Sequence, residues 1–597
     1  TDAEGHTTTY SYDSRGRLLT ETDALGQTIT YKRDVLGRVL TRTNESGNTS
    51  SLTYDDRNQA VKTITDALGQ VTENTYDASG NLTDVSYPSG TNTKTTYDTM
   101  GRVLSYTDEA GQTISYTYDS IGNKLTETKD DKTTTYTYDL AGNMTSVAYP
   151  DGTTVSYTLD AMGNIISMKD ALGQETTYEY SPAGRLVATV NPLGQRTSMT
   201  YDTNGNQNSV TDAAGYTAST TFTGQNQVDS VTDGLGNTTS FSYNQMEQLV
   251  EEVDALGGKS SYTYNALGHP VTFVDANGNT TKMSYTPTAQ LKEVVLPDGS
   301  TITKEYDALD RLIKQTHSSG LVTEYTYDAA NRVLTKKDNQ DLNESYTYDK
   351  AGNLLTLTNS LGEVNNYSYD SDNQLIKVTY ADGTSETFTY DVMGNVKTSM
   401  DQEGKTKTYY YDDNGNLTKT VDHLKRETKY KYDALNRIVT ETDPDGNKLT
   451  YEYDVLGNLA KVTDANGHSS TYGYDANQQL VLYTDPNGQA MAFKYDPLGR
   501  LVETLAPTGA KQAFTYDAVG NRLSETTGEG NTTTFTYDNM SRLSSLTKPT
   551  GGKTTYAYDE TGSLEKETNA NGHSTSYVND LYGRVTKRTL PNQAEYT

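Results

Sequence analysis

The stretch Thr9-Tyr10-Ser11-Tyr12-Asp13-Ser14-Arg15-Gly16-Arg17-Leu18 decides the fold, because the chain repeats it from end to end. A Thr-rich run follows this stretch and closes with Thr22-Asp23-Ala24-Leu25-Gly26-Gln27. The Tyr-Asp step returns every 21 residues, and 28 copies lie between Tyr12 and a degenerate copy at Asn579-Asp580. Such a period predicts a repeat array in which each unit buries its apolar side against its neighbours. We therefore expect residues 1–597 to form a single array.

The array has two irregularities in its spacing. The period slips by one residue before Tyr76-Asp77, and a compensating slip precedes Tyr138-Asp139. The chain also starts inside a copy, because Thr1-Asp2-Ala3-Glu4-Gly5 matches the second part of the repeat. We expect the 597 residues to be a fragment of a larger protein.

The composition predicts a thin sheet. Hydrophobic residues make up only 33% of the chain and 49 residues are Tyr, so the buried layer should be largely tyrosine.

The chain has no Cys, which excludes disulfides and thiolate metal sites. It has no long apolar run, so we expect no membrane span. The net charge of -30 argues against nucleic acid, whose phosphates are bound by clustered Lys and Arg.

Each copy reads as a β-hairpin. The segment from Thr8 to Tyr12 alternates β-branched and aromatic residues, which is the period of a half-buried strand. Asp13 to Arg17 forms a first turn, Leu18 to Thr22 a second strand, and Asp23 to Gln27 a second turn. Turns of this length join antiparallel neighbours, so the fold class is all-β. A parallel β-solenoid is the rival, but it requires aliphatic residues on several faces of each coil.

Some copies lack a residue of the Tyr-Asp step, which indicates that single losses are tolerated as expected of nearly independent repeats. Among them are Arg33-Asp34, Leu159-Asp160, Tyr180-Ser181, Phe222-Thr223, Tyr285-Thr286 and Asn579-Asp580.

The motif Tyr-x-Tyr-Asp-x-x-Gly-Arg/Asn-Leu, with Thr-Asp-x-x-Gly between copies, resembles the YD repeat of the RHS family over essentially the whole chain. The copies from Tyr495 to Leu501 and from Tyr516 to Leu523 carry it clearly. The family includes bacterial Rhs and wall-associated polymorphic toxins, B and C components of insecticidal toxin complexes, and the YD shell of teneurins. The resemblance implies a continuous sheet of hairpins that spirals into a hollow shell or barrel segment.

The chain departs from the family in lacking the Asp-Pro-x-Gly-Leu box at which the toxins cleave themselves. Asp443-Pro444-Asp445-Gly446 and Asp485-Pro486-Asn487-Gly488 fall in the ordinary second turn. Asp496-Pro497-Leu498-Gly499-Arg500 falls in the first turn. We therefore predict no self-cleavage.

The residues give little support for an enzyme, a cofactor or a metal. Acid-base catalysis needs two carboxylates in different environments, whereas the Asp and Glu carboxylates of this chain lie in equivalent turns. Of the six histidines, His6, His468 and His573 share the slot after the turn Gly and are variants of Gln27. The turns at Asp275, Asp464 and Asp485 lack the further ligands of a calcium loop and are interpreted as Asx turns.

The tyrosines allow two interpretations, as platforms for sugars or as ladders between hairpins, and repetition favours the ladder. We assign a structural role to the repeat residues, with no catalytic, cofactor or metal residue among them. They are Tyr12, Asp13, Gly16, Tyr306, Asp307, Tyr327, Asp328, Tyr411, Asp412, Gly415, Tyr453, Asp454, Gly457, Tyr495, Asp496, Gly499, Tyr516, Asp517 and Gly520.

The resemblance implies a non-enzymatic shell segment of a secreted or surface bacterial protein that encapsulates a C-terminal toxin of the same parent chain. The alternative is a surface adhesion scaffold that binds glycans or partner proteins. Strand spacing bounds the shape, since 56 strands at about 4.8 Å give roughly 270 Å of strip. We expect one or two windings with open ends and exposed edge strands.

Overall fold

The computed structural model describes all residues from 1 to 597, and it contains one continuous antiparallel sheet of 57 strands. Each strand pairs with the next strand in the chain, from β1–β2 to β56–β57. All contacts between strands join chain neighbours. The predicted all-β fold of successive hairpins is confirmed, and the parallel solenoid is excluded because every pairing is antiparallel.

The first 23 strands are β1 Thr9–Tyr12, β2 Leu18–Thr22, β3 Thr28–Arg33, β4 Val39–Thr43, β5 Thr49–Tyr54, β6 Val61–Thr65, β7 Val71–Tyr76, β8 Leu82–Ser86, β9 Asn92–Tyr97, β10 Val103–Thr107, β11 Thr113–Tyr118, β12 Lys124–Lys129, β13 Lys132–Tyr138, β14 Met144–Ala148, β15 Thr154–Leu159, β16 Ile165–Lys169, β17 Glu175–Tyr180, β18 Leu186–Val190, β19 Arg196–Tyr201, β20 Gln207–Thr211, β21 Thr217–Phe222, β22 Val228–Thr232 and β23 Thr238–Tyr243. The next 23 are β24 Leu249–Val253, β25 Lys259–Tyr264, β26 Pro270–Val274, β27 Thr280–Tyr285, β28 Leu291–Val295, β29 Thr301–Tyr306, β30 Leu312–His317, β31 Val322–Tyr327, β32 Val333–Asp338, β33 Asn343–Tyr348, β34 Leu354–Thr358, β35 Val364–Tyr369, β36 Leu375–Thr379, β37 Ser385–Tyr390, β38 Val396–Met400, β39 Thr406–Tyr411, β40 Leu417–Val421, β41 Glu427–Tyr432, β42 Ile438–Thr442, β43 Lys448–Tyr453, β44 Leu459–Thr463, β45 Ser469–Tyr474 and β46 Leu480–Thr484. The last 11 are β47 Ala490–Tyr495, β48 Leu501–Leu505, β49 Lys511–Tyr516, β50 Arg522–Thr527, β51 Thr532–Tyr537, β52 Leu543–Thr547, β53 Lys553–Tyr558, β54 Leu564–Thr568, β55 Ser574–Asn579, β56 Val585–Thr589 and β57 Glu595–Tyr596.

The Asp-x-x-Gly turns explain the hairpins. In the first turn the N–H of Gly16 donates to the carbonyl of Asp13 at 3.0 Å, and the N–H of Asp13 donates to the carbonyl of Arg17 at 2.9 Å. Gly16 has a φ of 76°, which suits a residue without Cβ. A type I turn followed by such a residue is a common connection between antiparallel strands. The second turn repeats these bonds between Asp23, Gly26 and Gln27.

Both slips in the period lie in turns. The turn after β5 holds one extra residue, so the N–H of Asp55 donates to the carbonyl of Ala60, at 2.9 Å. The turn after β12 is shortened to Asp130 and Asp131, and Lys129 pairs directly with Lys132. Asp130 takes a φ of 52° in this tight turn. Because both changes are confined to turns, the strands keep their inner and outer faces.

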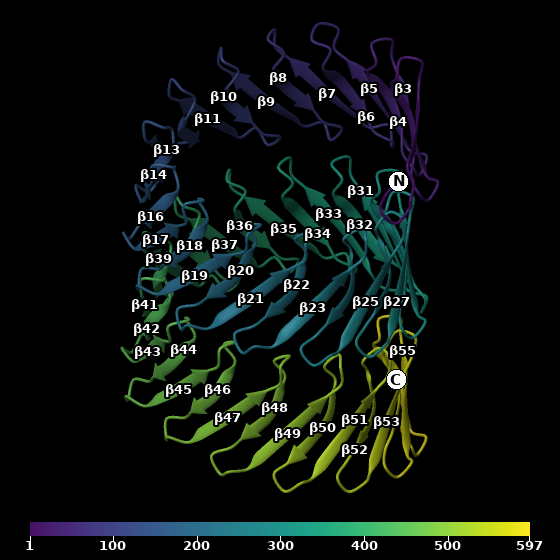
Figure 1. Cartoon of the computed structure of the whole chain (residues 1–597), viewed down its shortest axis with the longest axis vertical. Coiled ribbons are helices and arrows are strands. Elements are labelled where there is room, and N and C mark those ends of the chain that lie inside the picture. The colour runs from purple at the N-terminus through teal and green to yellow at the C-terminus, as the bar shows by residue number, and fades with distance from the viewer.

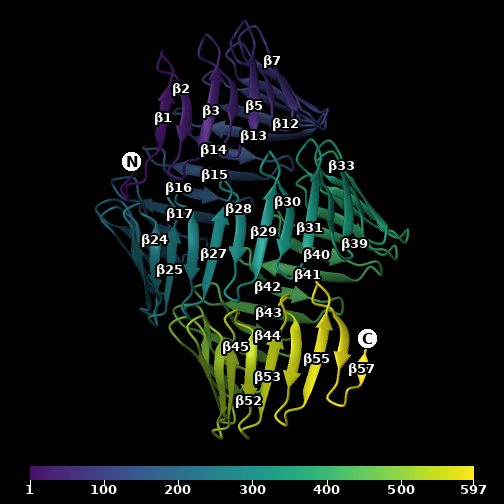
Figure 2. The same cartoon turned by 90° about the vertical axis from the view of Figure 1, so that its right-hand side faces the viewer.

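The sheet winds into a hollow cylinder made of stacked windings, which Figure 1 and Figure 2 show from two sides. Contacts between windings join residues 240 to 244 positions apart, such as Asn277 with Asp517 and Asp170 with Asn414. The turn after β16 therefore meets the turn after β39, so one winding takes 23 strands. At about 4.8 Å per strand this is roughly 110 Å of wall, or a diameter of roughly 35 Å.

The chain thus makes about two and a half windings, which exceeds the one or two that strip length had suggested. The difference arises because strand spacing gives the length of the strip and not its curvature, which the twist between strands decides. The expected open form is present, since β1 and β57 are each paired on one side only.

No helix in the structure is both long and apolar enough to cross a membrane.

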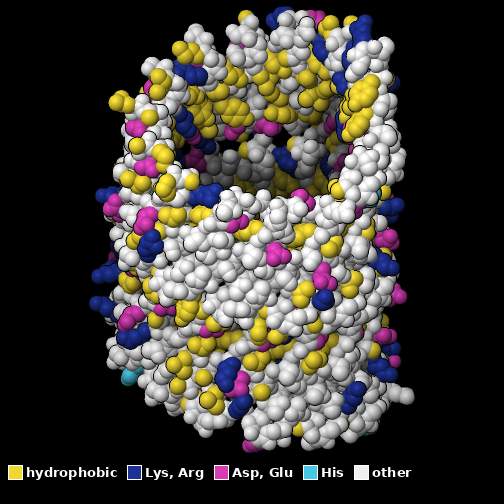
Figure 3. All heavy atoms as spheres, viewed as in Figure 1, with side chains coloured by type: hydrophobic (Ala, Val, Ile, Leu, Met, Phe, Trp, Pro, Cys, Tyr) yellow, Lys and Arg dark blue, Asp and Glu magenta, His cyan; other side chains and the backbone are white.

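The two faces of the sheet differ in character. Tyr10 lies opposite Glu21 and Tyr12 opposite Leu18, so these side chains share one face. Thr and Ser fill the other face, where cross-strand hydroxyls pair, as in Thr347–Thr356 at 2.6 Å. Figure 3 shows hydrophobic side chains lining the hollow of the uppermost winding, while hydrophobic and charged side chains are scattered over the outer wall.

The sheet has no packed core. Only seven of the 597 residues are buried, and none of the seven is a tyrosine. The expectation of a buried tyrosine layer is therefore wrong in degree, because one sheet without a second layer leaves its inner face half-exposed to the hollow. Stability must come from strand pairing, turn hydrogen bonds and contacts between adjacent repeats.

Candidate functional site

The Asp of the Tyr-Asp step holds its own turn. Asp307 Oδ1 accepts hydrogen bonds from the N–H groups of Leu309 at 2.9 Å and Arg311 at 3.1 Å. Its Oδ2 accepts from Arg311 Nε at 2.7 Å. The same backbone bonds, from residues two and four positions later, are made to Asp13, Asp328, Asp412, Asp454, Asp496 and Asp517. The turn glycines Gly16, Gly415, Gly457, Gly499 and Gly520 all have positive φ.

Hydrogen bonds within the turn lower the pKa of some turn carboxylates. The Asn81 amide donates to Asp77 at 2.9 Å, and this bond holds the pKa of the Asp77 carboxyl below its usual range. The Asn447 amide lowers the pKa of Asp443 in the same way. A general acid needs the opposite shift. Asp443 and Asp485 each accept backbone hydrogen bonds from the residues two and four positions later, so both turns have the geometry of the ordinary repeat.

The second Tyr of most Tyr-x-Tyr pairs ties its repeat to the preceding one. The hydroxyl of Tyr453 donates to the carbonyl of Ile438, 15 residues earlier, at 2.8 Å. Tyr306, Tyr327, Tyr411, Tyr495 and Tyr516 make the equivalent bond. Tyr12 has no preceding strand and is exposed.

This bond explains why some departures from the motif are tolerated. Arg33 replaces the tyrosine in its copy, and its Nε donates to the carbonyl of Leu18 at 3.0 Å. Asn579 replaces it near the C-terminus, and its Nδ2 donates to the carbonyl of Leu564 at 3.0 Å. Both side chains supply the donor that the carbonyl needs, although neither is aromatic.

The predicted stacking of tyrosine pairs between hairpins is wrong. Only three aromatic ring pairs occur in the structure, such as Tyr472–Tyr483, and none joins two tyrosines of successive Tyr-Asp steps. Instead the turn arginine lies over the tyrosine of the next repeat, as in Arg437 over Tyr453 with the guanidinium carbon 4.4 Å from the ring centre. Successive tyrosines lie two strands apart, which is too far for their rings to stack.

These arginine contacts were not expected from the sequence. Arg332 also donates from Nη1 to the carbonyl of Asp349 at 2.8 Å, and so binds the next turn. The signal was present in the sequence, because Arg often follows the Gly of the first turn and a Tyr stands 16 residues later, as in Arg102 and Tyr118.

The histidines do not gather. His6 pairs with Asp2 at 2.9 Å and His468 with Asp464 at 3.2 Å, each inside its own turn. No group of three or more His, Asp or Glu side chains has the geometry to hold a metal ion.

The inner wall is a candidate surface for contacts with other molecules. Half-buried aromatic rings recur on it one repeat after another, among them Tyr116, Tyr157, Phe241, Tyr325, Tyr430 and Phe493. Charged residues are interspersed, because Phe241 lies opposite Glu252 and Tyr430 opposite Glu441. Burial and a hydrogen bond to Glu344 raise the pKa of Tyr346 to about 12, so it stays neutral. The wall is therefore aromatic and apolar with scattered charges.

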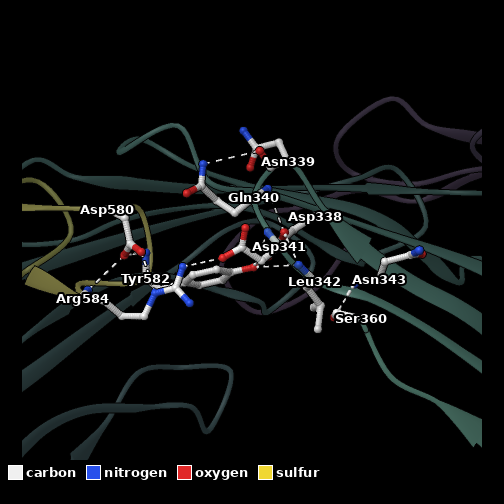
Figure 4. A network of polar contacts seen from close by, with 10 residues as sticks. All are labelled: Asp338, Asn339, Gln340, Asp341, Leu342, Asn343, Ser360, Asp580, Tyr582 and Arg584. Atoms are coloured by element: carbon white, nitrogen blue, oxygen red, sulfur yellow. Dashed lines mark hydrogen bonds and ion pairs between the residues drawn. The ribbon is translucent and has the colours of Figure 1, made fainter. Parts of the chain in front are cut away.

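The seam between windings is formed by turns, and Figure 4 shows one junction of it. The Tyr582 hydroxyl contacts the Asp338 carboxylate and accepts from the N–H of Leu342 at 3.1 Å. Arg584 bridges Asp580 of its own turn and Asp341 of the winding above, at 2.6 Å each. The windings are therefore joined by polar side chains at their edges.

A second junction joins Lys129 and Lys132 to Asp372. Lys129 Nζ lies 2.9 Å from Asp372, and Lys132 contacts the same carboxylate. The hydrogen bonds from Lys132 and Lys129 hold the pKa of Asp372 below its usual range. The shortened turn thus places two ammonium groups at one point of the seam.

Comparison with known families agrees with this repeat geometry. Overlapping matches to the RHS Repeat model cover residues 1–49, 54–217, 290–341, 369–407 and 411–553, which is well over half of the chain. The chain belongs to the RHS repeat family. Residues 218–289 lie outside the matches, yet β22 to β27 continue the RHS hairpins without a break. No curated protein matches the chain.

Solved structures with a similar fold include complexes of TcdB2 with TccC3 and a Tc holotoxin pore. TcdB2-TccC3-Cdc42 is 13% identical with a TM-score of 0.56, and the match covers 98% of this chain and 40% of that one. TcdB2-TccC3-TEV is 16% identical with a TM-score of 0.56, and the match covers 98% of this chain and 35% of that one. The Photorhabdus luminescens Tc holotoxin pore, with a mutated TccC3, is 16% identical with a TM-score of 0.50. This match covers 98% of this chain and 35% of that one. The chain thus spans well under half the length of these structures.

Proposed function

We propose that this RHS array is a non-catalytic shell segment that encloses a toxin domain carried C-terminally on the same parent chain. The observation that carries the proposal is the continuous winding of one sheet around a hollow whose wall is aromatic and half-exposed. A wall of this kind offers contacts to an enclosed polypeptide along its whole length. The seam needs no cargo to form, because its contacts are internal to the array.

The proposal extends to the context of the chain. The 597 residues are one array within a longer parent protein, and the solved shells that share the fold are longer by more than twofold. The parent protein is bacterial and acts outside the cell or at its surface. The absence of Cys suits such a location, since no thiol needs protection from oxidation.

Protease protection of the parent protein tests encapsulation. The parent chain is purified with its C-terminal domain in place, and trypsin is added under conditions in which the shell stays intact. The C-terminal domain should be cleaved at least tenfold more slowly than the same domain fused ahead of Thr1. Equal cleavage rates in the two arrangements would refute encapsulation.

A further inference from the structure

A cavity of about 830 Å³ lies in the seam between the first and second windings. One side is formed by the turns that contain Tyr149, Asp151 and Asp170, and the other by the turns after β37 and β39. Tyr409, Tyr410 and Tyr411 all line it, although successive residues of a strand point to opposite faces of a sheet. The cavity therefore reaches both faces of the wall and is accessible from outside.

The lining departs from the repeat at several positions. The residue between the two tyrosines of the motif is aromatic only at Tyr410, and elsewhere it is most often Thr or Ser. Tyr149 stands where most second turns have Asp or Asn, and Asp413 and Lys397 occupy slots that are uncharged in most copies. A Tyr recurs at the slot of Tyr149 only in Tyr87 and Tyr380, an Asp at the slot of Asp413 only in Asp56, and a Lys at the slot of Lys397 only in Lys62 and Lys292. Most repeats fold without these residues, so hairpin formation does not require them.

These side chains are also free. The Tyr410 side chain is 45% exposed, and it is held only by Lys419 over its ring at 4.2 Å. Lys397 and Asp413 are exposed and make no hydrogen bond or ion pair within the protein. By contrast, Asp391 and Asp412 are occupied by the N–H groups of their own turns. The cavity thus presents aromatic faces beside unpaired donors and acceptors.

We infer that this cavity is a binding site for a neutral saccharide. Aromatic faces accommodate the C–H surface of a sugar ring, and Tyr410 and Tyr149 lie on the two sides of the cavity. A sugar hydroxyl both donates and accepts, which matches the ammonium of Lys397, the amide of Asn395 and the carboxylate of Asp413. Five carboxylates against one Lys in the lining disfavour acidic sugars. This inference does not depend on the encapsulation proposal.

Saturation-transfer NMR on the 597-residue chain tests the inference. Cellotetraose, maltotetraose and the N-acetylglucosamine tetramer serve as neutral probes, sialyllactose as the acidic probe and tetralysine as the cationic probe. At least one neutral probe should show transfer, and its affinity should fall at least tenfold in Tyr410→Thr, which restores the residue found in other repeats. Asp413→Ser should weaken the same probe.

A matched control is Tyr216→Thr, which removes a tyrosine that is 41% exposed but remote from the cavity and should leave the affinity unchanged. Unchanged circular dichroism of Tyr410→Thr separates lost binding from lost folding. Absence of transfer to every neutral probe, equal binding by Tyr410→Thr and the parent chain, or preference for tetralysine or sialyllactose would each overturn the inference.

Discussion

Single side chains in this protein act as links between repeats. Tyr411 shows the pattern, because its hydroxyl donates to the carbonyl of Val396 at 2.9 Å and its ring is half-buried. Asp412 closes the turn that follows. Since similar links recur in most repeats, the contribution of any one residue is local and modest.

Tyr411→Ala should lower the stability of its own hairpin by about 1 to 3 kcal/mol and leave distant repeats protected. Tyr411→Phe removes the hydroxyl alone and should cost about 1 kcal/mol. Hydrogen exchange resolved along the chain measures both effects. Loss of protection throughout the array after either change would contradict nearest-neighbour stability.

At the scale of the hairpin, the fourth residue of the first turn, two positions before the second strand, decides whether the turn closes. Gly415 has a φ of 80°, whereas Asp310 and Ala289 adopt similar angles in their turns with a Cβ present. The conformation is therefore reachable by other residues at a cost in strain. The registers of neighbouring strands are the same at all these turns.

Gly415→Ala should destabilise its hairpin by about 1 to 2 kcal/mol because of the left-handed backbone. The nearest atom to the added Cβ is Asn395 Oδ1 at 3.9 Å, so no clash contributes. Gly473→Ala in β45 is the control, since its φ is not positive and the added Cβ meets Leu482 at an ordinary 3.5 Å. The temperature of thermal unfolding should be lowered by Gly415→Ala only. An equal decrease in both variants would contradict this prediction.

The turns at Asp443 and Asp485 should be chemically inert. Asp443 Oδ1 accepts from the N–H groups of Asp445 and Asn447, both at 2.9 Å, so it is engaged in holding the turn. We expect the purified chain to stay intact by mass spectrometry during long incubation. Fragments that appear on incubation, and that Asp443→Asn or Asp485→Asn abolishes, would show that these turns cleave the chain.

At the scale of the molecule, the windings are held by polar contacts between turns and by no strand pairing. Asp372 is central to one junction, with Lys129 and Lys132 around it. Its pKa is lower in the folded chain than the usual value. Such a carboxylate stabilises the fold above its unfolded pKa of about 3.9, and the stabilisation is lost as the pH falls through the lower folded value.

The seam should therefore weaken below about pH 4 and be intact at pH 7. Small-angle scattering should show a longer particle at pH 3 than at pH 7, while circular dichroism still reports paired strands. Asp372→Asn should shift the particle toward the longer form at pH 7, because a neutral amide cannot pair with two ammonium groups. The same dimensions at both pH values would contradict an ionic seam.

The sequence by itself determined the hairpins, their order and the turn geometry, because these depend on contacts within 21 residues. Tyr12, Asp13 and Gly16 each act on their own turn or on the adjacent strand, so a repeating pattern reveals their positions. Even the two slips were visible in the sequence, although not their location in the turns after β5 and β12.

Tertiary structure alone decided how residues about 242 positions apart meet. The 23-strand winding follows from small twists summed over many strands, and no local motif encodes that sum. It places Lys129 beside Asp372, Asp338 beside Tyr582, and Tyr149 across a cavity from Tyr410. It also turns the tyrosine face inward toward a hollow, where one sheet without a second layer leaves the rings half-exposed.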